Sequence, residues 1–292
     1  MSPTSPRDPL VATFSVVATD GTDWGVAVAS KFLAVGSAVP AARAEVGAIA
    51  TQAMANTSYK TLGMELLEAG RPASEVVEAL TGDDDERESR QLGVVDRNGG
   101  AATYTGANCF EWAGGRTGQG CACQGNILVG PEVVDTLLTV FESSQGDLVD
   151  RLLAALTAAD RAGGDRRGRQ SAALLVVRRN GGYRGLDDRM VDLRVDDHPQ
   201  PIPELTRLLG LWKLHFERVS PDSFLPVDEE VASRIGGALR RRRRLAKSAG
   251  PEKLWSAFDA WIAEENLEER SLSHDSIDPL VLAKLEGSPP FD

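Results

Sequence analysis

The chain has 292 residues, enough for one large domain or two modest ones, and its 42% hydrophobic and 26% charged residues are ordinary for a globular protein. The formal net charge of −11 argues against general nucleic-acid binding, which needs an excess of Lys and Arg. No apolar run approaches the roughly 20 residues that a membrane-spanning helix requires, so no membrane partner is expected.

The first segment, MSPTSPRDPL, is rich in proline and has no long apolar stretch. We therefore expect residues 1–12 to be a disordered leader and not a signal peptide. The cysteines are Cys109, Cys121 and Cys123, an odd number that, without a signal sequence, favours reduced thiols in a cytoplasmic protein. No second cysteine pair and no nearby histidine completes a zinc site around Cys121 and Cys123. Buried thiols are expected, with no metal and no cofactor.

Residues 13 to about 196 alternate short apolar runs with helix-like segments. TFSVVAT (13–19) and WGVAVAS (24–30) flank an Asp/Gly turn and predict a β-hairpin, and 91–106 predicts a second one. Further strands are expected at 46–53, 171–177 and 190–195, and helices at 58–70, 72–80, 131–144 and 147–162. Because hairpins imply antiparallel sheets and apolar strands imply sheets covered on both faces, the pattern favours a layered α/β sandwich.

Composition changes near DDHPQPIPEL (196–205), where prolines interrupt the pattern. We place a boundary near residue 200, which gives one domain over 13–200 and a small all-α domain over 201–292. In the second domain, apolar residues at helical spacing predict helices at 203–219, 227–247, 251–266 and 276–286. The run Arg240–Arg244 has two interpretations: contact with a polyanion, or a solvated helix end that complements the helix dipole.

The placement of histidine limits the chemistry of the first domain. All three histidines, His198, His215 and His274, lie near or beyond its end, so a Ser-His-Asp or Cys-His site would need His198 to fold back. The Gly-rich stretch 114–125 lacks the Gly-Lys-Ser/Thr ending of a nucleotide-phosphate loop. Without histidine, metal or nucleotide, the base of an enzyme must be a carboxylate, a lysine or a chain terminus. One solution is an N-terminal threonine, whose hydroxyl attacks an amide while its α-amine, with a pKa of roughly 7.7–8.0, takes the proton.

Three stretches, 13–56, 93–133 and 162–177, resemble the family called domain of unknown function 1028. They include TFSVVATDGTDWGVAVASKF, GVVDRNGGAATYTGANCF and AGGDRRGRQSAALLVV. That family is grouped with the N-terminal nucleophile hydrolases, so the resemblance implies their four-layer αββα sandwich over about 13–200. The tail AFDAWIAEENLEERSLSHDSIDPLVLAKL (257–285) resembles the peptidoglycan-binding-like domain that is often appended to this family.

The resemblance implies that Thr13 is the nucleophile. Family members commonly begin Met-Thr-Phe-Ser, whereas twelve residues precede Thr13 here. Either this leader is cleaved, or the start codon is misassigned, or Thr13 is only a strand residue. By the same layout Lys31 would lie beside Thr13 and lower its proton affinity, with a surface lysine as the alternative. Gly47 and Asn126 are candidate oxyanion donors, or else a strand glycine and a turn residue.

The loop GDRRGRQS provides the candidate substrate-binding residues, which are Asp165, Arg166, Arg169 and Gln170. Arginine forks pair well with carboxylates, so Arg166 and Arg169 could hold an acidic substrate; an internal Arg–Asp network is the alternative. If Thr13 is not the nucleophile, Ser30 and Cys109 are the next candidates. The sequence thus predicts an N-terminal nucleophile-type amidohydrolase of a small acidic amide, assembled as a homo-oligomer. The alternative is a non-catalytic ligand-binding or assembly protein with the same sandwich.

Overall fold

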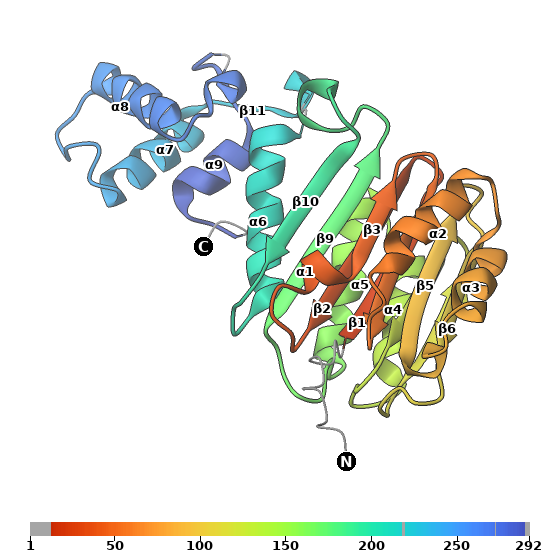
Figure 1. The fold of residues 1–292 in the computed structure, drawn as a ribbon. Coiled ribbons are helices and arrows are strands. Elements are labelled where there is room, and N and C mark those ends of the chain that lie inside the picture. Colours follow the sequence, from red (N-terminus) through yellow and green to blue (C-terminus); the bar gives the residue numbers. More distant parts are fainter. Residues whose placement is uncertain (1–12, 218–219, 272, 290–292) are drawn as a thin grey trace. The chain divides into compact units, whose positions relative to one another are not determined.

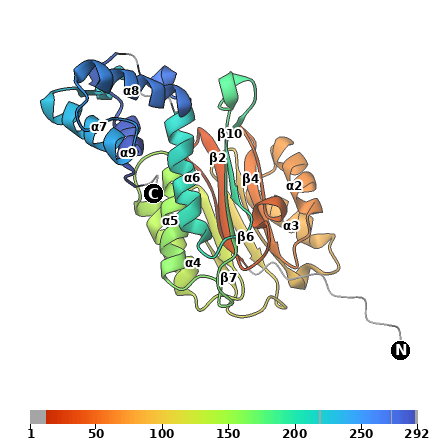
Figure 2. The same cartoon turned by 90° about the vertical axis from the view of Figure 1, so that its left-hand side faces the viewer.

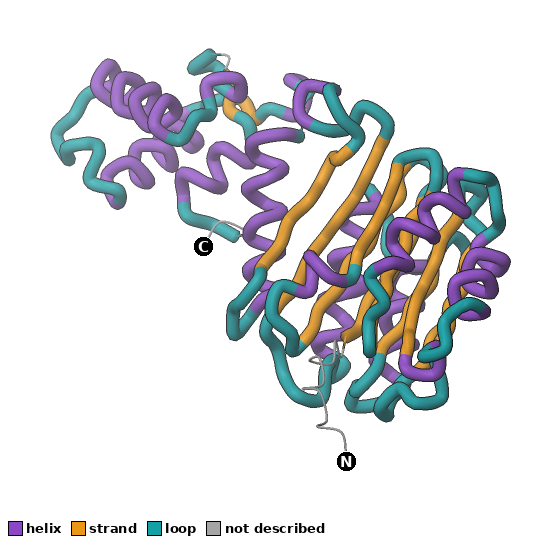
Figure 3. Tube along the Cα trace, in the orientation of Figure 1, coloured by secondary structure: helices purple, strands orange, loops and turns teal. Residues whose placement is uncertain are grey.

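The computed structural model describes residues 13–217, 220–271 and 273–289, and it divides the chain into two compact units, Met1–Leu205 and Thr206–Asp292. Unit 1 contains two β-sheets and their covering helices, and unit 2 is chiefly helical (Figures 1 and 3). The division falls within helix α6 (Pro201–Phe216). The expected leader over residues 1–12 lies outside the described residues.

A six-stranded antiparallel sheet in the order β10-β9-β2-β1-β8-β7 is the larger sheet of unit 1. Its strands are β1 (Thr13–Thr19), β2 (Asp23–Ser30), β7 (Gly114–Gly118), β8 (Cys121–Gly125), β9 (Ser171–Arg178) and β10 (Arg189–Val195). Every residue of β1 and β2 is buried. Their Val- and Ala-rich sequences suit strands that are covered on both faces.

A second, four-stranded antiparallel sheet has the order β3-β4-β5-β6. Its strands are β3 (Pro40–Arg43), β4 (Gly47–Ala53), β5 (Arg90–Asp96) and β6 (Ala101–Thr105). The two sheets face each other across a shared apolar core, in which Val26 and Val28 of the first sheet pack with Ala48, Ala50 and Val95 of the second. This core consists chiefly of Val and Ala, with Trp24 and Leu175 as its larger members.

Helices cover the outer faces of both sheets. The first sheet contacts α4 (Glu132–Ser143) and α5 (Leu148–Arg161), and the second contacts α2 (Ser58–Glu68) and α3 (Ala73–Gly82) (Figure 2). A short helix, α1 (Val35–Ala38), follows β2. Leu67, Val76 and Leu80 of α2 and α3 pack on Ile49 and Leu92. Along the stacking direction, unit 1 therefore runs helices, sheet, sheet, helices.

Unit 2 has its own apolar core around Leu214, Ile235, Phe258, Trp261 and Leu282. Its helices after α6 are α7 (Glu229–Arg241), α8 (Pro251–Glu264) and α9 (Pro279–Glu286), and two short strands, β11 (Leu225–Pro226) and β12 (Ser276–Ile277), pair with each other. Single-turn 3₁₀ helices lie at Arg87–Ser89, Tyr183–Gly185, Pro221–Ser223 and Glu268–Arg270. Within the described parts of the chain, no helix is both long and apolar enough to cross a bilayer.

The predicted mixed α/β class with antiparallel sheets is confirmed, as is a helical C-terminal region. Strands β7 and β8 differ from the prediction, because they form in the Gly-rich stretch in which no strand was expected. Glycine weakens a strand by itself, yet here it allows close approach. A Cβ on Gly115 would lie 2.6 Å from the Thr103 hydroxyl, and one on Gly125 would lie 2.4 Å from the Leu128 side chain.

Candidate functional site

Three hydroxyl side chains form a row across one end of the first sheet. Thr13 opens β1 and pairs with Ser30 at the end of β2, which in turn pairs with Ser171 at the start of β9. Two positions further into the sheet, Val28 and Ala173 belong to the core between the sheets. Because strand side chains alternate between faces, the three hydroxyls also face the second sheet. Thr13 Oγ1 donates to Ser30 Oγ at 3.2 Å, and both side chains are buried.

Beside this row lie four buried carboxamide side chains, which we call the amide cluster: Gln52, Gln91, Gln124 and Asn126. Gln52 Nε2 donates to the backbone oxygen of Thr13 at 3.3 Å and to Gln91 Oε1 at 2.8 Å. The backbone N–H of Asn126 also donates to the Thr13 oxygen, at 3.0 Å, and its Nδ2 donates to Gln91 Oε1 at 2.9 Å. The carbonyl of Thr13 is therefore held from both sheets.

Ser15 connects two members of the amide cluster, Gln52 and Gln124. Its hydroxyl donates to Gln52 Oε1 at 2.7 Å and accepts from Gln124 Nε2 at 2.7 Å. The space for Gln124 comes from Gly93 on β5, where a Cβ would lie 2.1 Å from Gln124 Oε1. Buried amides are costly unless they are hydrogen-bonded, so this cluster fixes the positions of its members. No local sequence pattern predicted this cluster, although a glutamine inside an otherwise apolar run was an available signal.

Two residues with left-handed backbone conformation adjoin the amide cluster. Ala53 has φ 65° directly after Gln52, and Ile127 has φ 52° directly after Asn126. A β-branched residue in this region is a genuine outlier with a cost of order 1–3 kcal/mol, and such residues concentrate at functional sites. The Ile127 N–H donates to the carbonyl of Phe110 at 2.9 Å, which helps to hold the strained turn. The strain lies at the same end of the sheets as Thr13.

The predicted catalytic residues do not all gather here. Asn126 contacts Thr13 directly, as described. Lys31 follows Ser30, but its side chain is exposed and Nζ donates to the carbonyl of Arg169 at 3.3 Å. Gly47 lies at the other end of β4 from Gln52, and five residue steps of about 3.3 Å separate them by roughly 17 Å. The register that brings Gln52 to Thr13 therefore carries Gly47 away.

The predicted substrate-binding loop is anchored by Asp165, which is 5% exposed. Asp165 accepts from the backbone N–H of Lys31 at 2.8 Å and forms an ion pair with Arg167 at 3.1 Å. Arg169 pairs with Asp160 at 2.7 Å, and that hydrogen bond raises the pKa of its guanidinium.

The other two members of the loop differ from each other. The backbone N–H of Gln170 donates to the Ser30 carbonyl at 3.0 Å, and its side chain donates to Asp197. Arg166 is exposed, and among the described residues no carboxylate pairs with its guanidinium. Its backbone N–H donates to the Ile127 carbonyl at 2.9 Å, which places Arg166 next to the strained turn.

Two further features lie near the amide cluster: the thiol of Cys109, and an ion pair between Arg90 and Asp84 that we call the charged brace. Burial raises the pKa of the Cys109 thiol to about 11, so little of it is the nucleophilic thiolate at neutral pH. Arg90, which precedes Gln91, donates to Asp84 at 2.9 Å and to the carbonyl of Met54 at 2.6 Å. Burial opposes ionisation of Asp84, but hydrogen bonds from Arg90, Asn56 and Tyr59 outweigh it and lower the pKa of the carboxyl. This brace fixes the start of β5.

The fold defines the chain as a layered α/β protein with two facing antiparallel sheets, followed by a helical unit. A model described as a family of unknown function (DUF1028) matches residues 13–205, and the chain belongs to that family. Residues 215–285 match a model described as "Putative peptidoglycan binding domain". Both predicted resemblances are confirmed.

Among solved structures, the chain is similar to the crystal structure of protein SPO2555 from Silicibacter pomeroyi, which carries the same DUF1028 family description. The two chains are 32% identical, with a TM-score of 0.63, and the match covers 69% of this chain and 86% of that one. No curated protein matches the sequence.

Proposed function

We propose that this protein hydrolyses a small amide, with Thr13 as its nucleophile once the peptide bond before Thr13 is cleaved. The observation that carries the proposal is the position of Thr13: a buried hydroxyl opens a central strand, and the amide cluster holds its carbonyl from both sheets. The family match also begins at this residue. The layer order of unit 1 supports the comparison with N-terminal nucleophile hydrolases, which share an αββα sandwich.

In the proposed reaction, Thr13 Oγ1 attacks the carbonyl carbon of the substrate while the freed α-amine of Thr13 accepts the hydroxyl proton. An α-amine with a pKa of roughly 7.7–8.0 can do this near neutrality. The C–N bond then breaks, the amine product leaves with that proton, and the acyl group stays on Oγ1 as an ester. Water attacks the ester, releases a carboxylic acid and restores the hydroxyl.

Ser30 and Asn126 have supporting roles in this proposal. The Ser30 hydroxyl orients Oγ1 through the 3.2 Å hydrogen bond. Asn126 Nδ2 has two hydrogens, and its hydrogen bond to Gln91 uses one. The second can donate to the oxygen that becomes negatively charged during attack. Gly47 and the ammonium group of Lys31 have no part in the proposal, because one lies far along β4 and the other bonds to Arg169.

The proposed substrate carries a carboxylate, and Arg166 is the residue proposed to bind it. Asp165 and Arg169 already have partners within the protein, whereas the exposed guanidinium of Arg166 has no carboxylate partner in the described part of the chain. Arginine binds a carboxylate through two parallel hydrogen bonds, which would also orient the amide.

The test is turnover of a panel of N-acyl amino acids, ureido acids and muropeptide fragments by the wild type, by Thr13→Ala and by Thr22→Ala. Thr22 is a matched control, because it lies exposed in the β1–β2 turn. The proposal expects hydrolysis by the wild type and by Thr22→Ala, and none by a folded Thr13→Ala. Unchanged hydrolysis by Thr13→Ala would place the nucleophile elsewhere. Absence of hydrolysis in all three would favour the non-catalytic binding function.

A further inference from the structure

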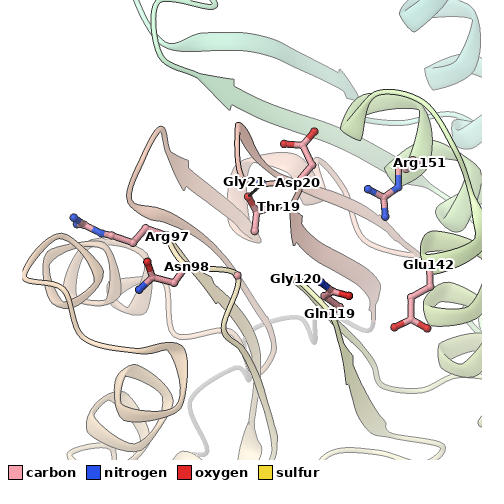
Figure 4. Close-up of a pocket in the computed structure, with 10 residues that line it drawn as sticks. Thr19, Asp20, Gly21, Arg97, Asn98, Gln119, Gly120, Glu142 and Arg151 are labelled. Carbon is pink, nitrogen blue, oxygen red and sulfur yellow. Dashed lines mark hydrogen bonds between the residues drawn. The ribbon is translucent and has the colours of Figure 1, made fainter.

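A cavity of about 520 Å³ opens at the opposite end of the two sheets from Thr13. The tips of the β1–β2, β5–β6 and β7–β8 hairpins surround it, together with the end of α4 and the start of α5 (Figure 4). β1 has seven residues, so at about 3.3 Å per residue this cavity lies roughly 20 Å from Thr13. Its size falls in the range of small-molecule sites, which is roughly 300–1,000 Å³. The cavity is therefore separate from the site proposed for hydrolysis.

Arg151, near the start of α5, is the side chain of this cavity that can bind an anionic group. Its guanidinium lies 4.2 Å over the ring of Phe141 and donates one hydrogen bond, at 3.1 Å, to the Phe141 carbonyl. Its Nε is buried without a hydrogen-bond partner, and in the described part of the chain only Trp261 has another such side-chain atom. No carboxylate forms an ion pair with Arg151 among these residues. Because Nε is enclosed, a ligand in the cavity would contact the terminal nitrogens of Arg151, of which Nη2 also bonds to the Phe141 carbonyl.

Arg97 does not supply a second anion-binding group. Its guanidinium donates to the carbonyls of Leu67 and Glu68 at the end of α2, at 3.2 and 3.1 Å. Figure 4 shows Arg97 directed away from the space that Arg151 enters. One arginine is thus available to a ligand, and it is held in place by the Phe141 ring and carbonyl.

Two carboxylates lie on the same cavity. Asp20 is fixed because its Oδ1 accepts from the backbone N–H groups of Thr22 and Asp23, at 2.9 and 2.8 Å, and its Oδ2 is left for other contacts. Glu142 lines the cavity from the end of α4. One guanidinium with two carboxylates repels a doubly charged anion such as phosphate. It suits a ligand that carries one negative and one positive group.

We propose that this cavity binds a small zwitterion of the amino-acid type. The carboxylate of the ligand binds to the terminal nitrogens of the Arg151 guanidinium. The ammonium group of the ligand faces Asp20 and Glu142. The site is independent of the proposed hydrolase function, since none of its residues belongs to the Thr13 end of the sheets.

The test measures binding to the full chain by thermal shift and then by calorimetry. The test ligands are the standard L-amino acids at millimolar concentration. Three control ligands accompany them: propionate, which is L-alanine without its ammonium group, ethylamine, which is L-alanine without its carboxylate, and inorganic phosphate. The proposal expects at least one amino acid to bind and to raise the unfolding temperature. Propionate, ethylamine and phosphate should bind at least about tenfold more weakly. Binding of phosphate, propionate or ethylamine as tight as the best amino acid, or no binding by any amino acid, overturns the proposal.

Variants then locate the site. Arg151→Met should weaken amino-acid binding about tenfold or more, whereas Arg161→Met, at the exposed end of the same helix, should not. If Arg151→Met does not fold, Arg151→Lys keeps the charge and still loses the fork. Asp20→Asn retains an amide oxygen for the turn and removes the negative charge, so it should weaken amino-acid binding. Unchanged affinity in both the Arg151 and Asp20 variants would contradict the assignment.

Discussion

Gln91 is the side chain on which the hydrogen bonds of the amide cluster converge, so its replacement by leucine is a severe test of the site's architecture. Gln91 Oε1 accepts from Gln52 and Asn126, and Nε2 donates to the Thr105 hydroxyl and to the carbonyls of Gly125 and Gly114. Gln91→Leu removes all five bonds while keeping a side chain of similar size. Thr105 and Gly114 are only partly buried and can bond to water instead.

The cost comes from groups that remain buried. Asn126 Nδ2 loses its acceptor, Gly125 O loses a donor, and Gln52 Nε2 keeps only the longer bond to Thr13. An orphaned buried polar group costs about 1–3 kcal/mol. One group without its acceptor and two groups with fewer bonds, partly offset by the apolar surface that leucine buries, give an expected loss of about 2–4 kcal/mol in the free energy of unfolding.

The measurement is urea unfolding of the wild type and Gln91→Leu, followed by circular dichroism. Gln170→Leu is the matched control, since its amide forms one exposed hydrogen bond with Asp197, and it should change the free energy of unfolding by less than about 0.5 kcal/mol. Gln91→Glu should also destabilise, because an oxygen replaces the nitrogen that faces the carbonyls of Gly114 and Gly125. A loss below about 1 kcal/mol for Gln91→Leu would refute the view that the cluster holds the two sheets in register.

Two further changes test the surroundings of the cluster. Gly93→Ala would place a Cβ 2.1 Å from Gln124 Oε1, so we expect a loss of about 1–3 kcal/mol in the free energy of unfolding. Gly82→Ala is the control: Gly82 has open space around it at the end of α3, so this variant should be neutral or slightly stabilising. Chemical unfolding of both variants measures the two free energies, and equal stability of the variants would contradict the expectation. Asp84→Asn should destabilise the protein most at neutral pH. The folded pKa of Asp84 lies below its unfolded value of about 3.9, so its contribution to stability is present above that pH and declines as the pH falls toward the folded pKa. Urea unfolding at pH 7, 5 and 3 should therefore show a difference in stability from the wild type that shrinks with acidity, and a constant difference would exclude a stabilising role for the ionised carboxylate.

Local patterns in the sequence predicted most elements of the fold. Helices α2 to α5 begin and end within about two residues of their predicted bounds, because apolar spacing and the Gly and Pro residues between them mark these positions. The hairpin of β1 and β2 follows from its turn residues and alternation. Strands β7 and β8 were not predictable in this way, since their glycines are explained only by neighbours such as Thr103 on the other sheet.

The candidate site was predictable only in part, for a related reason. Thr13 and Asn126 were identified from the resemblance, and they do lie in contact. The bonds that join Gln52 to Gln91 and Gln91 to Asn126 cross 39 and 35 residues of chain, and they depend on how the two sheets stack. That stacking also explains why Gly47 lies far from Thr13. Neither the register of one sheet against another nor the direction of the Lys31 side chain is encoded in a local pattern.

The most direct test of the proposed nucleophile is the N-terminal residue of the purified protein, read from its intact mass and by N-terminal sequencing. The account predicts a chain that begins at Thr13, and it predicts that the processed form alone turns over an amide substrate. A chain that retains residues 1–12 and still hydrolyses the substrate would contradict it, because the amine of Thr13 would then be an amide that cannot accept the hydroxyl proton.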